Sequence, residues 1–253
     1  MPRPDWPTAA AFVPPSLPSG PDLGALASAA AGCRGCPLWE PATQTVFGAG
    51  PPDAKLVVVG EQPGDQEDRR GAPFVGPAGQ LLDGALEEAG IDRSAAYVTN
   101  AVKHFKFRAQ GKRRMHATPD TWEVRACTPW LQAELAAIRP ELVVLLGATA
   151  GKAVFGPAFR VTQSRGVLLP WPPSGDSARF GSGQALATLH PSAVLRADDV
   201  AAARAGLVAD LRVAAQALAA QAASGSRSTS EGGVQPPQGA SRSTTQLPSV
   251  LRR

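Results

Sequence analysis

Long apolar runs are absent from this sequence. No stretch reaches the length of about 18 apolar residues that a membrane-spanning helix needs, and the start "MPRPDWPTAAAF" lacks the charged-then-apolar order of a signal peptide. The glycine patterns of a Walker phosphate loop and of a dinucleotide-binding strand are absent too. We therefore expect a cytoplasmic protein without a membrane partner.

Cysteine and histidine are scarce. The three cysteines are an odd number, so they cannot all pair within the chain, and a cytosolic setting would keep them reduced. This favours metal binding or simple burial. The three histidines leave few candidates for histidine chemistry: His104, His116 and His190.

Acidic residues are slightly fewer than basic ones, but the excess positive charge lies mostly in the C-terminal tail. Of the net charge of +4, residues 224–253 supply +3, because they hold four arginines and one glutamate. Global charge is therefore weak evidence for nucleic-acid binding, and a local basic cluster carries more weight. That cluster consists of Lys103, Lys106, Arg108, Lys112, Arg113 and Arg114.

Hydrophobic patterning is missing from both ends of the chain. Residues 1–22 are rich in proline, and residues 223–253 are mainly Ser, Gly, Gln, Thr and Pro. Such compositions predict disorder. The remaining residues, 23–222, have enough apolar content for one domain with its own core.

Within residues 23–222, short apolar runs alternate with helical stretches. The predicted strands are 55–60, 96–100, 141–147 and 185–190, and the predicted helices are 76–90, 118–138 and 200–219. This alternation indicates an α/β fold with a central parallel sheet of about four strands between two helical layers.

Polar segments follow three of these strands: "GEQPGDQED", "NAVKHFKF" and "HPSAVLR". Open parallel sheets bind ligands beyond the carboxyl ends of their strands, so we expect these segments to form a pocket. The segment after the second strand continues into "GKRRMH" at 111–116, which lacks apolar periodicity and is expected to be a basic loop.

Several motifs resemble the iron-sulfur uracil-DNA glycosylases of family 4. They are "GEQPGDQEDRRGAPFVGPAGQLL", "YVTNAVKHFKF" and "HPSAVL", in the family's order, and "KRRMH" is similar to the extra loop of the family's UdgX branch. The resemblance covers roughly residues 23–219. It implies the uracil-DNA glycosylase fold, DNA repair activity and a 4Fe-4S cluster.

The resemblance implies that the cluster is held by Cys33, Cys36 and Cys127, with His104 where the family usually has a further cysteine. An imidazole in place of a thiolate makes the site less negative and should raise its potential. On spacing alone, a Cys3His set also suits zinc. Cys127 could instead be a buried thiol on the core face of its helix.

For the base pocket, the resemblance implies that Phe74 stacks on uracil, Asn100 reads its edge and His190 donates to its O2 atom. Backbone N–H groups around Gln62 would add donors to the uracil anion that forms, and Ser192 belongs to the substrate-binding set. The target nucleotide has to leave the base stack, so single-stranded DNA is the preferred substrate and partner. We expect the protein to act as a monomer.

In the UdgX branch, the loop histidine takes the place of the attacking water, and the matching residue is His116. After attack on C1′, a carboxylate would remove the remaining ring proton, which makes the imidazole a poorer leaving group. Glu61 resembles that partner, and Asp65 is a second candidate. Lys112, Arg113 and Arg114 are expected to hold DNA phosphates.

This interpretation predicts a glycosylase that traps itself on uracil-containing DNA after a single turnover. Two alternatives stay open. One is a conventional family 4 glycosylase with turnover, in which His116 only touches phosphate. The other is a non-catalytic, metal-containing module that binds single-stranded DNA, and the release of free uracil would exclude it.

Overall fold

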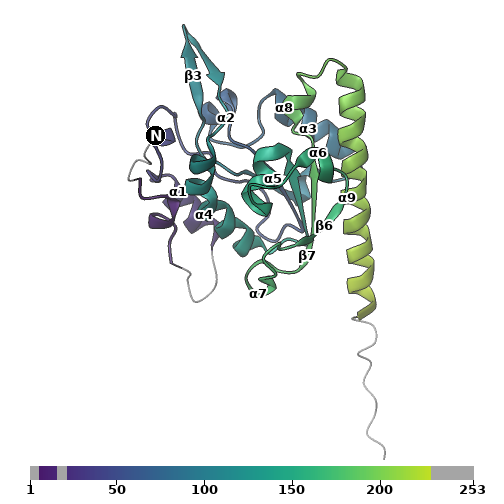
Figure 1. The fold of residues 1–253 in the computed structure, drawn as a ribbon. Helices are drawn as coiled ribbons and strands as arrows, with labels where there is room; N and C mark the ends of the chain where they lie inside the picture. Colours follow the sequence, from purple (N-terminus) through teal and green to yellow (C-terminus); the bar gives the residue numbers. More distant parts are fainter. Residues whose placement is uncertain (1–5, 16–21, 229–253) are drawn as a thin grey trace, which may run out of the picture.

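A five-stranded sheet forms the middle layer of the protein (Figure 1). The computed structural model describes residues 6–15 and 22–228. The strand order is β2-β1-β5-β7-β6, where all pairs are parallel except β6 with β7. The strands are β1 (Leu56–Gly60), β2 (Ala96–Asn100), β5 (Leu142–Leu146), β6 (Leu168–Trp171) and β7 (Gly183–Thr188). The mostly parallel α/β sheet is confirmed, and β6 is an edge strand that the sequence did not predict.

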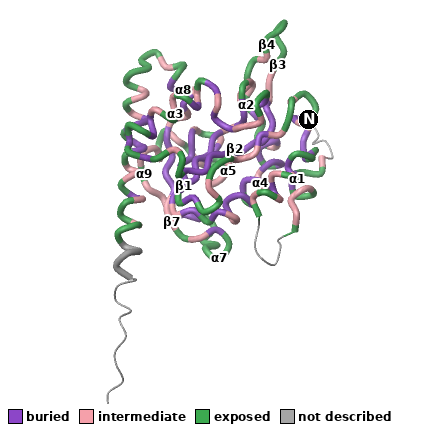
Figure 2. Tube along the Cα trace, turned by 180° about the vertical axis from the view of Figure 1, so that it is seen from behind, coloured by how far each residue is buried: buried purple, intermediate pink, exposed green. Residues whose placement is uncertain are grey.

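Helices cover both faces of the sheet because its buried strands are apolar on both sides. On one face, Val57 and Val59 pack with residues of α1 (Leu23–Ala30), α4 (Thr121–Ile138) and α5 (Gly147–Phe155). On the other face, Leu56 and Val58 pack with residues of α3 (Pro77–Glu88) and α9 (Val200–Ser228). The α/β/α layering follows from this alternation, and Figure 2 shows the strands as the buried centre.

Shorter elements connect these layers. They are η1 (Ala9–Ala11), η2 (Pro37–Trp39), α2 (Asp65–Arg70), η3 (Arg93–Ala95), α6 (Val161–Ser164), α7 (Ser177–Phe180) and α8 (Pro191–Val194). None of the helices in the described residues is both long and apolar enough to cross a membrane.

The segment predicted to be a basic loop is a β-hairpin that projects from the body of the protein (Figure 1). Strands β3 (Phe107–Gln110) and β4 (Arg113–His116) pair antiparallel, with Phe107 opposite His116. A two-residue turn joins them, and its Gly111 has φ +57°, a conformation that glycine adopts without steric cost. Most hairpin residues are exposed, which is why apolar periodicity did not reveal the strands.

The structure also differs from the disorder predicted for residues 1–22. Thr8 N–H donates to the carbonyl of Gly35 over 3.1 Å, and Ala9 is buried in the same core as α1 and α4. Residues 6–15 are therefore packed onto the domain, while 1–5 and 16–21 lie outside the described residues. At the other end, α9 runs beyond the predicted limit to Ser228, and residues 229–253 are not described.

Candidate active site

A cavity of about 190 Å³ lies where strands β1, β2 and β7 end. Six of the residues predicted from sequence meet there: Gln62, Phe74, Asn100, His116, His190 and Ser192. The remaining lining residues are Gly64, Glu67, Ala78 and Arg196. The carboxyl ends of the parallel strands thus bring together segments that are more than 100 residues apart in the chain, as expected for this sheet type.

Asn100 and Phe74 form one side of the cavity and both approach Gly60. Asn100 is the last residue of β2 and is 3% exposed, and Phe74 is held at φ 56°, which is rare for a residue with a side chain. A Cβ atom on Gly60 would collide with Asn100 Oδ1 and lie 2.7 Å from Phe74 Cζ. Gly60 therefore leaves the space that the amide and the ring occupy.

The hydrogen bonds of His190 determine which of its nitrogens carries a proton. The N–H of Ser192 donates to His190 Nδ1 over 3.1 Å, and Ser192 Oγ lies 2.8 Å from the same atom. Burial, together with the neighbouring His116 and Arg196, lowers the pKa of His190 to about 4. The ring is therefore neutral near pH 7, and because Nδ1 accepts a hydrogen bond, its proton lies on Nε2.

His116 lies at the base of the hairpin, beside Glu61. Its Nε2 atom is 3.4 Å from Glu61 Oε1, and the other carboxylate oxygen accepts a hydrogen bond from Thr149 Oγ1. Burial lowers the pKa of His116, and so does the nearby Arg196, while Glu61 raises it. The net shift is downward, so the imidazole is neutral near pH 7. The structure places His116 beside Glu61, and the transfer of a proton between them stays a prediction.

The Gln62 side chain anchors the hairpin. Its Nε2 donates to the carbonyls of Lys106 and Ala117, and its Oε1 accepts from the N–H of Lys106, all over 3.0–3.1 Å. Both polar atoms of the amide are thus engaged, so we assign the side chain to positioning His116. A role of the backbone N–H groups around Gln62 in binding the base stays a prediction.

Arg114 is also an anchor of the hairpin, which corrects its predicted role as a free phosphate-binding cation. Its guanidinium contacts Asp65 over 2.5 Å and Asp68 over 2.6 Å, and it packs over the rings of Phe105 and Phe107. The two carboxylates of α2 neutralise it. Asp65, the second candidate for a catalytic carboxylate, is used in this contact and is not among the residues that line the cavity.

Half of the predicted basic cluster is neutralised in this way. Lys103 pairs with Glu134, Lys106 with Asp120 and Glu123, and Arg114 with α2. Arg108, Lys112 and Arg113 are exposed.

Lys112 lies in the hairpin turn, four residues from His116. At about 3.4 Å per residue, this places it about 14 Å along the strand from the imidazole. Any phosphate bound at the turn would therefore be remote from His116 and the cavity.

The three cysteines are free, buried and part of one apolar cluster. Burial raises the pKa of Cys36 to about 11 and that of Cys127 to about 12. The N–H of Lys103 donates to Cys127 Sγ over 3.3 Å. His104 Nε2 instead lies 2.9 Å from Thr45 Oγ1, and burial lowers the pKa of its ring to about 4. The donor types suit a cluster, but among residues 6–15 and 22–228 no three such groups are positioned to hold a metal ion.

A fully buried ion pair, Lys103 with Glu134, contacts the backbone at the end of β2. Lys103 Nζ contacts Glu134 and also donates to Thr99 Oγ1 over 2.7 Å and to the backbone carbonyl of Asn100 over 2.8 Å. Glu134 in turn accepts from the hydroxyls of Tyr97 and Thr99. This network fixes the backbone of the residue whose amide faces the cavity. Its lysine is also the residue whose N–H contacts Cys127.

Glu134→Gln is expected to destabilise the protein by about 3–5 kcal/mol, because it leaves the Lys103 ammonium buried without a counter-charge. The midpoint of urea unfolding measures this loss. The matched control is Glu141→Gln, whose partner Lys55 is 63% exposed, so its loss should be about 0–1 kcal/mol. Equal losses in the two variants would show that the buried pair is not a stability determinant.

Several site residues were missed in the sequence. Glu67 accepts from the N–H groups of Gly76 and Gly64 over 2.7 and 3.1 Å and so joins the two loops around the cavity. Arg196 adds a cation to the lining, and Thr149 orients Glu61. A glycine at the end of an apolar strand and an arginine after "HPSAVL" were visible signals for Gly60 and Arg196. Glu67 lies in the segment "GEQPGDQED" that was expected at the pocket, whereas Thr149 had no such signal.

Comparison with known proteins places this site in a family. A profile of the Uracil DNA glycosylase superfamily matches residues 47–212. The type-4 uracil-DNA glycosylase of Thermotoga maritima is 39% identical over 165 residues, which cover 65% of this chain and 78% of the relative. The type-4 enzyme of Pyrobaculum aerophilum is 35% identical over 69% of this chain and 85% of its own length. That of Sulfurisphaera tokodaii is 38% identical over 55% of this chain and 62% of its own length. The chain belongs to the uracil DNA glycosylase superfamily.

Proposed function

We propose that this protein excises uracil from DNA by cleaving the N-glycosidic bond. The observation that carries the proposal is the small cavity in which a buried amide, an aromatic ring and a histidine donor meet at the strand ends. The similarity to type-4 uracil-DNA glycosylases supports the same activity. Single-stranded DNA is the preferred substrate, because no base pair has to be broken before the uracil enters.

Asn100 is the group that selects uracil. Its amide can accept from uracil N3–H and donate to O4, whereas cytosine presents an amino group and no N3–H at these positions. Because the amide is 3% exposed, a mispaired cytosine would leave it without water to compensate. Sites built around such buried hydrogen bonds discriminate strongly against a ligand that cannot make them. Phe74 provides the stacking surface.

His190 stabilises the departing base. As the glycosidic bond breaks, uracil leaves with the electron pair and negative charge develops on its oxygens. A neutral ring with its proton on Nε2 can donate to O2 without first losing a proton. A well-placed donor of this kind lowers the barrier by about 3–4 kcal/mol.

The fate of the sugar cation separates two forms of the function. In the conventional form, water attacks C1′, an abasic site is released and the protein turns over. The similarity to type-4 glycosylases favours this form over the covalent capture that the sequence analysis put first. Glu61, held by Thr149 at the edge of the site, is positioned to orient the water.

Covalent capture by His116 is a second candidate, and one geometric observation favours it. The neutral imidazole lines the cavity, and one of its nitrogens faces a carboxylate at 3.4 Å. A ring nitrogen would bond to C1′ as uracil leaves, and the remaining N–H proton would pass to Glu61. The product is a neutral alkylated imidazole attached to the DNA.

His116→Ser distinguishes the two forms. Protein and a uracil-containing single-stranded oligonucleotide are incubated, free uracil is quantified by chromatography, and the DNA is analysed on a denaturing gel. We expect free uracil with both wild type and variant and an alkali-labile DNA product, with no SDS-stable band. A slower band with wild type that His116→Ser removes would establish capture by His116 instead. If no uracil is released, the non-catalytic DNA-binding alternative applies.

We also propose that Cys33, Cys36 and Cys127 hold an iron-sulfur cluster. The support is the sequence resemblance, the presence of three free thiols, and an N–H donor on Cys127, while in the described residues these groups are not arranged around one metal position. His104 is the proposed fourth ligand, although its ring faces Thr45 here. No step of the excision is assigned to the cluster.

Purified protein is expected to contain iron and acid-labile sulfide and to absorb broadly near 400 nm, as iron-sulfur centres do. Metal analysis by mass spectrometry with a sulfide assay measures this. His104→Cys should retain the iron and lower the reduction potential, since a thiolate adds negative charge. Stoichiometric zinc without iron would refute the cluster, and an unchanged potential would refute His104 as a ligand.

A further inference from the structure

A second hollow lies between α4 and α5, separate from the uracil cavity. Its volume is about 510 Å³, within the range of roughly 300–1,000 Å³ that is usual for ligand sites. None of its lining residues belongs to the uracil cavity. We call it the α4–α5 groove; it is lined by Thr118, Pro119, Thr121, Val124, Arg125, Thr128, Thr149, Lys152, Ala153, Gly156 and Pro157.

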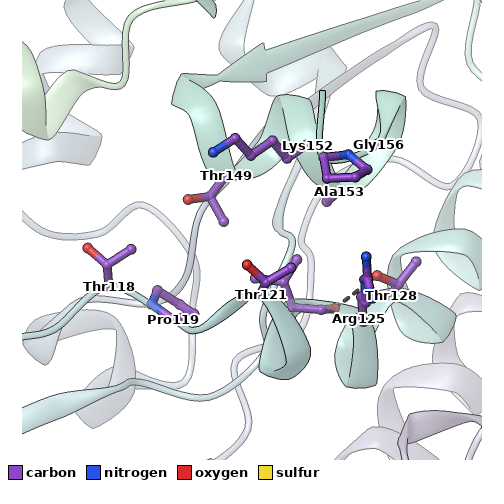
Figure 3. Close-up of a pocket in the computed structure, with 11 residues that line it drawn as sticks. Thr118, Pro119, Thr121, Arg125, Thr128, Thr149, Lys152, Ala153 and Gly156 are labelled. Carbon is purple, nitrogen blue, oxygen red and sulfur yellow. Dashed lines mark hydrogen bonds between the residues drawn. The ribbon is translucent and has the colours of Figure 1, made fainter. Parts of the chain in front are cut away.

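The charge of the α4–α5 groove is entirely positive. Arg125 lies on the α4 wall and Lys152 on the α5 wall (Figure 3), and no carboxylate lines the groove. Both side chains are exposed, and neither forms an ion pair with any residue of the described ranges. This differs from Lys103, Lys106 and Arg114, whose charges are neutralised by acidic partners. Each of these two uncompensated cations is available to contact an anion in the groove.

The remaining lining suits a sugar-phosphate chain. Pro119, Val124, Ala153 and Pro157 provide apolar contact surface, and the hydroxyls of Thr118 and Thr121 are further donors. Protein–DNA contacts of this type hold the backbone from charged and hydroxyl side chains and do not depend on base sequence. A nucleobase reader would need buried amides or aromatic rings, and the groove has neither.

The groove adjoins the reacting centre. Thr149 lines the groove and donates to Glu61, the carboxylate beside His116. Thr118 lies two residues after His116, and Ala117 between them is held by Gln62. The contacts from Thr149 to Glu61 and from Glu61 to His116 thus connect the groove with the uracil cavity.

We propose that the α4–α5 groove binds the phosphodiester backbone of the DNA strand on one side of the excised nucleotide, with Arg125 and Lys152 contacting successive phosphates. This rests on the proposed function, because the strand reaches the groove from the uracil cavity. The groove then provides contacts to the DNA backbone. Arg114 cannot provide them because its charge is neutralised, and the cations of the hairpin turn are remote from His116.

The test is the double variant Arg125→Gln with Lys152→Gln. Both residues are exposed on helices and glutamine is a good helix former, so folding should be unaffected. The matched control is Lys55→Gln with Arg212→Gln, which removes the same charge at exposed positions outside both hollows. Binding of a fluorescent single-stranded oligonucleotide without uracil is measured by anisotropy at several salt concentrations.

The groove variant should bind roughly tenfold more weakly than the control at low salt. Its slope of log affinity against log salt should be shallower by about 1.4, since each lost phosphate contact on a single strand contributes about 0.7. Uracil excision should show a raised KM and an unchanged kcat. With substrates extended only 5′ or only 3′ of the uracil, the loss should appear for one extension and not for the other.

Three results would overturn the proposal: an affinity and salt slope equal to those of the control, an equal loss for both one-sided substrates, or a loss of inorganic phosphate binding with DNA binding intact. The last would assign the groove to a free phosphate compound. The anisotropy measurement needs no excision, so a protein that binds through the groove without releasing uracil would refute the proposed function and leave the groove assignment standing.

Discussion

Asn100→Ala is expected to slow uracil release on the order of 10³-fold, because two hydrogen bonds to the uracil edge are lost in a site with almost no water access. The measurement is the single-turnover rate at saturating protein, with free uracil quantified by chromatography. Binding to uracil-free single-stranded DNA should be unchanged, since phosphate contacts do not involve the base edge.

Gly60→Ala provides an independent control for this interpretation. The added Cβ would meet Asn100 Oδ1 and Phe74 Cζ, so it displaces the amide and the ring without altering either group chemically. We expect it to reproduce a large part of the loss in Asn100→Ala. If both variants instead lose affinity for uracil-free DNA to the same extent, Asn100 supports the fold and does not read the base.

His190→Ala should reduce kcat by about 10²–10³-fold, because the donor to the uracil anion is lost. Ser192→Ala is the matched control. It removes the hydroxyl at 2.8 Å but keeps the backbone N–H that holds Nδ1 as an acceptor, so the loss should be much smaller. A comparable loss in both variants would show that the ring acts only when the Ser192 hydroxyl is present.

The pH dependence of stability tests the protonation state of His190. Its pKa is about 4 in the fold and about 6.5 in the unfolded chain, so the unfolded state binds the proton first as the pH falls. The stability that neutral His190 contributes is therefore complete above pH 6.5 and is lost progressively toward pH 4. In His190→Ala, the free energy of unfolding should depend less steeply on pH in this window, as urea denaturation at several pH values would show.

The buried strands were predictable because β1, β2, β5 and β7 each contain a run of three or more apolar residues. The two elements that were missed have different physical origins. Pro170 lies inside β6, and proline is tolerated there because β6 is an edge strand. The hairpin β3–β4 has no buried face of its own, so its side chains carry no hydrophobic pattern.

Site residues could be predicted where they lie at the end of a strand. They could not be predicted where their role depends on a hydrogen-bond or ion-pair partner that is distant in the sequence. Asn100 and His190 are the last residues of predicted strands, so their convergence was foreseeable. The role of Arg114 depends on Asp68, 46 residues away, and that of Gln62 on the carbonyl of Ala117, 55 residues away. A list of basic residues in sequence does not reveal which of them are neutralised.

The most direct test of the proposed function is the amount of uracil released per protein molecule when uracil-containing single-stranded DNA is present in tenfold excess. A catalytic glycosylase predicts a release that continues well beyond one uracil per protein and leaves alkali-labile DNA, while cytosine-containing DNA releases no base. An absence of free uracil from protein that binds the same DNA would contradict the account.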